Sequence, residues 1–124
     1  MATVELTQTN FEDTISNNDL VLIDFWAPWC GPCRSFAPIY EQVSQKYPAV
    51  LFAKVNTDQE QALAGNFNIR SIPTLMIFRE QIIIFSQAGS LPASALEEVI
   101  NKALDLDMDM VREEISKQQE QADA

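Results

Sequence analysis

Trp29-Cys30-Gly31-Pro32-Cys33 is the stretch of this 124-residue chain that decides its fold, because it joins two segments of opposite character. The segment before it, residues 20–27, is almost continuously hydrophobic, which is typical of a strand buried on both faces. The segment after it, residues 34–47, carries apolar side chains at helical spacing. The five residues therefore lie at a turn from a strand into a helix, and they include both cysteines of the chain.

The segments on either side continue this alternation of strand and helix patterns. Strands are expected at residues 4–6, 20–27, 50–56, 74–78 and 82–86, and helices at residues 11–17, 34–47, 59–66 and 92–104. The early alternation predicts parallel strands, and the closely spaced last two strands predict an antiparallel hairpin. We therefore expect an α/β fold with three layers, α/β/α, around a mixed sheet. The hairpin loop 79–81 lacks Gly, Asn and Asp, so a strained or lengthened turn is expected there.

Composition and charge exclude several classes of protein. Hydrophobic residues make up 47% of the chain and charged residues 21%, as in an ordinary globular domain. No apolar run approaches the roughly 20 residues of a membrane helix, and the N-terminus lacks a signal-peptide pattern, so we expect a cytoplasmic location. A net charge of −10 repels nucleic acid and anionic lipid, and neither is an expected partner.

The cysteine pair is the candidate reactive centre. A thiol at a helix N-terminus is stabilised as the thiolate by free backbone N–H groups and the helix dipole. Cys30, closer to the exposed turn, is the expected attacking thiolate, and Cys33 is the expected resolving thiol that displaces the reduced partner. Gly31 allows another backbone to approach, and Pro32 is favourable at the start of a helix.

A half zinc site and a pair of buried structural thiols are the alternatives to a redox pair. The chain has no histidine, which excludes a Cys/His zinc site, a Cys-His nucleophile pair and a Ser-His-Asp triad. A four-thiolate zinc site would need two chains. A Cys-x-x-Cys pair beside a strand–helix pattern in a cytosolic chain favours redox chemistry, and no metal site is expected.

Two longer motifs resemble signatures of the thioredoxin family. Residues 23–33, Ile-Asp-Phe-Trp-Ala-Pro-Trp-Cys-Gly-Pro-Cys, are similar to its active-site signature. Residues 69–74, Ile-Arg-Ser-Ile-Pro-Thr, resemble its second signature, and Pro38 matches a proline that kinks the following helix. The resemblance covers residues 3–104. It predicts a thioredoxin domain at residues 1–104, followed by an acidic extension at 105–124. Ser71 departs from the glycine common at that position.

The resemblance implies a function and its partners. A member of this family is expected to be a protein-disulfide reductase that cycles between dithiol and disulfide and contributes to cell redox homeostasis. It would bind no cofactor and would receive electrons from NADPH through thioredoxin reductase. Its partners would be that reductase and disulfide-containing client proteins. The dipeptide Gly31-Pro32 is implied to mark a reductant.

Asp24 is the one carboxylate inside the buried run 20–27. Burial raises the pKa of a carboxyl group, and the simplest alternative is a structural aspartate bonded to its surroundings. The resemblance implies instead that Asp24 accepts the proton of Cys33, through a water molecule, with Lys54 on the adjacent strand as its cationic partner.

Pro73 precedes a strand, where an ordinary trans proline is the simplest expectation. The resemblance implies a cis proline facing the cysteines, with backbone groups of residue 72 exposed to an extended peptide. The implied client groove consists of Trp29, Gly31, Pro32, Ile72, Pro73 and Gly89. Trp26 is expected to pack in the core.

Residues 105–124 hold seven acids and two bases, a net charge of −5. Ile100, Leu104, Met108, Val111 and Ile115 form a helical stripe, which predicts that the last helix continues into this tail. Residues 118–124 are expected to be disordered. The stripe could dock on the body, pair two chains or lie loose. We expect a monomer, with a tail-mediated dimer as the alternative.

Two other functions compete with a reductase. In one, the fold is a binding module or subunit whose thiols are incidental. In the other, the pair works as an oxidant or isomerase. Both cysteines, Asp24 and the Gly-Pro dipeptide favour the reductase.

Overall fold

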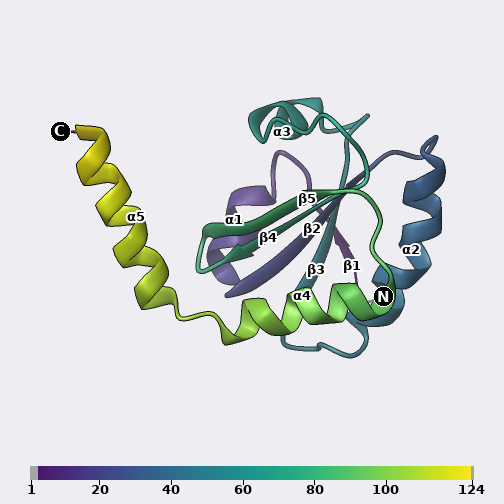
Figure 1. The fold of residues 1–124 in the computed structure, drawn as a ribbon. Helices are drawn as coiled ribbons and strands as arrows, with labels where there is room; N and C mark the ends of the chain where they lie inside the picture. Colours follow the sequence, from purple (N-terminus) through teal and green to yellow (C-terminus); the bar gives the residue numbers. More distant parts are fainter. Residues whose placement is uncertain (1–2, 124) are drawn as a thin grey trace.

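The structure, a computed structural model, describes residues 3–123, without the side chains of residues 122 and 123. A five-stranded sheet in the order β1-β3-β2-β4-β5 forms its centre (Figure 1). The strands are β1 (Thr3–Glu5), β2 (Leu20–Trp26), β3 (Leu51–Asn56), β4 (Thr74–Arg79) and β5 (Ile82–Ala88). Strands β1, β3 and β2 are parallel, whereas β4 runs antiparallel to β2 and β5. The predicted mixed sheet with a terminal hairpin is confirmed.

Helices cover both faces of this sheet, as the three-layer prediction requires. The helices are α1 (Phe11–Asn17), α2 (Gly31–Ser44), α3 (Gln61–Asn66), α4 (Ala93–Asp105) and α5 (Met108–Asp123). Side chains of α2 and α4 form one buried cluster with Leu22, Phe52 and Leu75 of the sheet. Side chains of α1 and α3 form a second cluster with Ile23 and Val55 on the opposite face.

Strand β2 is the central strand, and it carries the polypeptide to the cysteines. Its residues from Leu20 to Phe25 are all buried, since β3 and β4 flank it and helices cover both of its faces. The strand ends at Trp26, and helix α2 starts at Gly31, three residues earlier than predicted. The earlier start follows from Cys30 acting as the helix cap and from Pro32 in the first turn.

The β4–β5 turn is tighter than the predicted three-residue loop. Strand β4 includes Arg79, which leaves only Glu80 and Gln81 between the strands. Both residues have positive φ, 50° and 70°, which L-amino acids other than Asn and Asp rarely adopt. Of the two expected outcomes, the strained turn is therefore confirmed and the lengthened turn is wrong.

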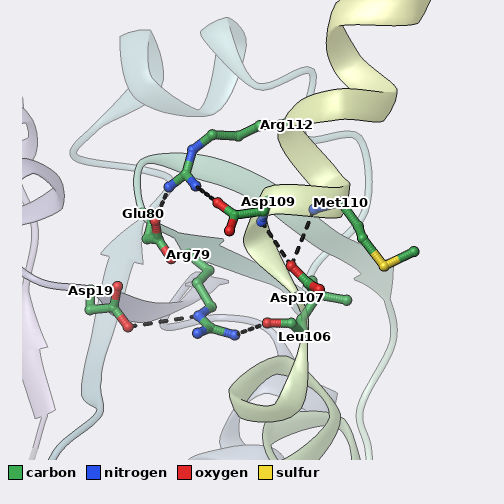
Figure 2. A network of polar contacts seen from close by, with 8 residues as sticks. All are labelled: Asp19, Arg79, Glu80, Leu106, Asp107, Asp109, Met110 and Arg112. Carbon is green, nitrogen blue, oxygen red and sulfur yellow. Dashed lines mark hydrogen bonds and ion pairs between the residues drawn. The ribbon is translucent and has the colours of Figure 1, made fainter.

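The prediction of one continuous C-terminal helix is wrong. Helix α4 ends at Asp105 and α5 begins at Met108. Asp107 Oδ1 accepts hydrogen bonds from the backbone N–H groups of Asp109 and Met110, at 3.0 and 3.2 Å (Figure 2). An aspartate side chain that binds these N–H groups favours a new helix start over continuation of the old helix.

Arg79 holds the break between the two helices in place. Its Nη1 donates to the carbonyl oxygens of Ala103, Leu104 and Leu106, at 2.7, 3.1 and 2.7 Å. Its Nε lies 3.7 Å from Asp19 Oδ2, at the start of β2 (Figure 2). One arginine at the end of β4 therefore connects the end of α4 to the residue before β2.

A second arginine connects α5 to the hairpin turn. Arg112 forms ion pairs with Glu80 and, one helical turn away, with Asp109 (Figure 2). Helix α5 extends through Asp123, so the disorder expected from residue 118 is wrong up to that point, and Ala124 lies outside the described residues. In Figure 1, α5 projects from the end of the sheet remote from the start of α2. No helix within residues 3–123 is long and apolar enough to span a membrane.

Candidate active site

Cys30 and Cys33 form a disulfide at the junction of β2 and α2, with their Cα atoms 5.2 Å apart. Cys30 is the N-cap residue of α2, and Cys33 lies in its first turn. The two side chains are equally buried, 4% and 3% exposed, against Ala27, Trp26 and Ile72. In the disulfide form, exposure therefore does not distinguish the two sulfur atoms.

The start of α2 nevertheless distinguishes the two sulfur atoms. The backbone N–H of Cys33 donates to Cys30 Sγ at 3.2 Å. A helix N-terminus carries partial positive charge and N–H groups without intrahelical partners. These groups favour negative charge on the Cys30 sulfur once the disulfide is reduced.

The loop before β4 forms the opposite wall of the site. Cys30 Sγ lies 3.7 Å from the carbonyl oxygen of Ile72. The Ile72–Pro73 peptide bond is cis, as predicted from the resemblance. Gly89 donates its N–H to the Pro73 carbonyl at 2.8 Å with φ of 104°, a conformation that favours glycine. Three residues of the predicted groove are thus gathered beside Cys30.

The other three predicted groove residues lie at the surface around the disulfide. Trp29 is 67% exposed, and Gly31 and Pro32 are exposed as well. A Cβ atom added to Gly31 would meet no atom within 4 Å, so the space beside this backbone is open. A partner's backbone could therefore approach the disulfide from this side.

Asp24 lies on β2, two residues before Trp26, and is completely buried. Neither of its carboxylate oxygens has a hydrogen-bond partner among the described protein groups. Burial raises the pKa of Asp24 from 3.8 to about 7, Lys54 counteracts this increase, and Glu5 adds to it. A carboxyl group with this pKa can exchange a proton near neutral pH.

Lys54 is opposite Asp24 in the β2–β3 register, on the strand that the sequence predicted. Its Nζ lies 4.6 Å from the ring centroid of Trp26, in a cation–π contact. Lys54 therefore influences Asp24 through its electric field while its ammonium group contacts the indole ring. Trp26 packs partly buried against the disulfide, consistent with its predicted place in the core.

Comparison with known proteins identifies the family. The family model described as Thioredoxin matches residues 2–102. The chain belongs to the thioredoxin family. It is 53% identical over 121 residues to "Putative thioredoxin 2" of Streptomyces coelicolor, covering 98% of this chain and 90% of the relative. It is 42% identical over 104 residues to the thioredoxin of Porphyra purpurea, covering 82% and 97%.

A solved structure of Plasmodium falciparum thioredoxin has the same fold. It superposes with a TM-score of 0.75 at 37% identity, covering 80% of this chain and 97% of the Plasmodium chain. The chain is therefore a thiol-disulfide oxidoreductase of the thioredoxin family, and the Cys30–Cys33 pair is its redox-active centre. The Streptomyces alignment takes in 98% of this chain and so extends into α5, whereas the family model ends at residue 102. The domain boundary at residue 104 stays a prediction.

Ser71, the departure from the family pattern, is exposed, and its carbonyl accepts a hydrogen bond from Thr74 Oγ1 at 2.6 Å. This hydrogen bond joins the two ends of the short loop that contains Pro73.

Among residues 3–123, no group of three or more His, Cys, Asp or Glu side chains could hold a metal ion.

Sequence reasoning missed Asp58, which holds Trp29 in position. The Trp29 Nε1–H group donates to both Asp58 carboxylate oxygens, at 3.2 and 3.1 Å. The Asp58 N–H in turn donates to Asn56 Oδ1 at 3.0 Å, at the end of β3. Because 29 residues separate Trp29 from Asp58, no local pattern indicates this contact.

Proposed function

We propose that this thioredoxin is a general reductase of protein disulfides that works in the cytoplasm and is recharged by thioredoxin reductase with electrons from NADPH. The hydrogen bond from the Cys33 N–H to Cys30 Sγ supports the central assignment, because it favours a thiolate on Cys30. The family supports redox partners of this kind. No bound cofactor, nucleic acid, membrane or second copy of the chain is needed for the cycle below.

In the first step, the Cys30 thiolate attacks one sulfur of a client disulfide. A bond forms between Cys30 and that sulfur, the client S–S bond breaks, and the other client sulfur leaves as a thiolate that takes a proton from solvent. The helix terminus that stabilises the Cys30 thiolate remains beside the mixed disulfide.

In the second step, Asp24 accepts the proton of Cys33 through a water molecule. The resulting Cys33 thiolate attacks Cys30 Sγ, and the Cys30–Cys33 disulfide forms. The bond between Cys30 and the client breaks, and the client sulfur that was attached to Cys30 leaves as a thiolate and takes a proton. The client has gained two electrons and the thioredoxin has lost two. The burial of Asp24 and its pKa of about 7 support this role, since the group can hold and release a proton at neutral pH. Lys54 limits the increase in that pKa.

The client binds as an extended segment across the groove residues Trp29, Gly31, Pro32, Ile72, Pro73 and Gly89. The exposed indole ring of Trp29 and the open space beside Gly31 support this placement. An apolar groove of this kind suits unfolded or locally opened segments of many proteins.

Reduction of insulin disulfides, coupled to NADPH oxidation by a bacterial thioredoxin reductase, tests the proposal. The wild-type chain should turn over, Cys30→Ser should abolish turnover, and Cys33→Ser should accumulate a mixed disulfide through Cys30. Turnover that persists in a Cys30→Ser/Cys33→Ser variant would contradict the chemistry. A reduction potential well above about −200 mV would instead indicate an oxidant or isomerase.

A further inference from the structure

Three charged residues form a row across three neighbouring strands. Glu5 of β1 is in register with Lys54 of β3, and Lys54 is in register with Asp24 of β2. Side chains in register on adjacent strands point to the same face of the sheet. Lys54 therefore has a carboxyl group on each side: buried Asp24 on the inner strand and exposed Glu5 on the edge strand.

The Lys54 ammonium group is not committed to either carboxyl group. Its Nζ lies over the Trp26 ring, two residues beyond Asp24 on the same strand and face. Lys54 counteracts the increase in the pKa of both Asp24 and Glu5. One cation thus serves two acids, and each acid reduces the stabilisation that the cation gives to the other.

No other charged group faces Asp24 within the described residues. Helix α2 contributes Tyr40, whose pKa is raised by burial and by Asp24, and whose hydroxyl donates to the Ala53 carbonyl at 2.8 Å. Cys33 of α2 is in the disulfide. Strand β4 places the apolar Leu75 opposite Asp24, and α4 contributes apolar side chains to the same cluster.

The described surroundings of Glu5 come from β3 and α2. Its neighbour on β1, Thr3, donates to the carboxylate of Glu41 on α2 at 3.2 Å. Lys54 is the cation that acts on Glu5. Because Glu5 lies on the edge strand, a change there leaves the buried core around Asp24 in place.

We propose that Glu5 is a positioning residue for the resolving step: by competing with Asp24 for Lys54, it sets how readily Asp24 takes the proton of Cys33. This inference rests on the proposed role of Asp24. The negative charge of Glu5 offsets part of the positive potential that Lys54 produces at Asp24. This raises the pKa of Asp24, so Asp24 keeps its proton to higher pH. Without that carboxylate, Asp24 should ionise at lower pH.

The test begins with the oxidised protein, in which neither cysteine titrates. Asp24 is followed by its ¹³C carboxyl chemical shift, assigned by loss of the signal in Asp24→Asn. We expect Glu5→Gln to move the Asp24 titration midpoint toward acid pH. Glu5 and Asp24 are two strands apart, about 10 Å, so the ionised fraction of Asp24 at pH 6 should rise roughly two- to ten-fold.

Two variants control this measurement. Glu114→Gln removes the same charge from an exposed position on α5 and should leave the Asp24 midpoint unchanged. Glu5→Asp keeps the charge and should retain most of the wild-type behaviour. A midpoint in Glu5→Gln that equals the midpoint in Glu114→Gln would overturn the proposal.

The second measurement is the rate of mixed-disulfide resolution as a function of pH, in single-turnover stopped-flow experiments. The pH profile in Glu5→Gln should move in the same acid direction as the Asp24 titration. If Asp24→Asn leaves the wild-type profile unchanged, then the proposed role of Asp24 fails, whatever Glu5 does. If Asp24→Asn abolishes the profile but Glu5→Gln does not move it, then the inference about Glu5 alone fails.

Discussion

The indole N–H of Trp29 donates to both carboxylate oxygens of Asp58, which connects an exposed residue of the proposed groove to the loop after β3. Trp29 is 67% exposed, so packing alone does not fix the orientation of its ring. A hydrogen bond to a charged acceptor fixes this orientation while the ring stays exposed. Asp58 therefore orients the wall of the proposed groove through its contact with Trp29.

Replacing Asp58 with alanine should weaken protein reduction more than it weakens thiol chemistry. Loss of one exposed, charge-assisted bond corresponds to about 1 kcal/mol, or roughly a five-fold decrease in kcat/KM for insulin. Reduction of a small aromatic disulfide, which does not occupy the groove, should change little. Asp58→Asn retains an acceptor for the indole and serves as the matched control. An equal loss with both substrates would show that Asp58 acts on the cysteines instead.

Asp24→Asn should stabilise the fold, and the gain should depend on pH. The pKa of Asp24 is about 7 in the folded chain and near 3.8 without burial, so ionisation destabilises the fold as the pH rises through this interval. Below pH 3.8 both states hold the proton and the substitution gains nothing from charge. Above pH 7 the gain approaches on the order of 4 kcal/mol, less the cost of a buried amide.

Urea unfolding of wild type and Asp24→Asn at pH 5 and pH 8 measures this gain. The difference between the two proteins isolates Asp24 from the other carboxyl groups, which titrate in both. A larger gain at pH 5 than at pH 8 would contradict the assignment of a raised pKa. The same variant should slow resolution of the mixed disulfide at pH 7, as the proposed proton transfer requires.

The cysteine site could be predicted because its signals are local in sequence. Cys30, Cys33 and Pro32 lie in one turn, and the buried run before them predicted the central strand. The resemblance also placed Pro73 beside the sulfur atoms. The row from Glu5 to Asp24 depends on which strands are neighbours and on their register, and neither follows from the spacing of residues within a segment.

The C-terminal segment shows where periodicity fails. An apolar stripe through Leu104, Met108 and Val111 predicted one continuous helix. The spacing of three and four residues is the same whether or not the backbone breaks between two helices, so it could not reveal the end of α4 and the start of α5. The break depends on the side chain of Asp107 and on Arg79, which is 24 residues away from Ala103 in sequence. The aspartate at the new helix start was a usable signal for a cap.

Arg79→Ala should destabilise the chain, whereas Arg112→Ala should not. The Arg79 side chain is 16% exposed and bonds three carbonyl oxygens, so its loss leaves the partly buried Ala103 carbonyl without this donor, at a cost of about 1–3 kcal/mol. The ion pair of Arg112 is between half-exposed side chains, where such pairs contribute about 0–1 kcal/mol. Urea midpoints measure both changes, and amide hydrogen exchange at the end of α4 should accelerate only in Arg79→Ala. Equal effects would contradict the distinction.

Gln81→Gly should stabilise the β4–β5 turn. Gln81 has φ of 70°, where an L-residue costs about 1–2 kcal/mol, and glycine removes that cost. The greater entropy of glycine in the unfolded chain offsets about 0.5–1 kcal/mol of the gain. The net expectation is a stabilisation of up to about 1 kcal/mol in urea unfolding, with Glu80 and its ion pair to Arg112 retained. Gln87→Gly, within strand β5, is the contrasting control and should destabilise the protein.

Met108 and Met110 allow a matched test of how α5 is attached to the body. Met108 is 5% exposed and Met110 is 66% exposed, although both lie in the first turn of the same helix. Met108→Ala should therefore lower stability by about 1–3 kcal/mol, and Met110→Ala should change it by less than about 0.5 kcal/mol. Both variants should keep wild-type insulin reduction, because α5 projects from the end of the sheet remote from the start of α2 (Figure 1). Equal stability of the two variants would mean that α5 is not docked through Met108. A loss of turnover confined to Met110→Ala would mean that the exposed side of α5 takes part in binding the client or the reductase.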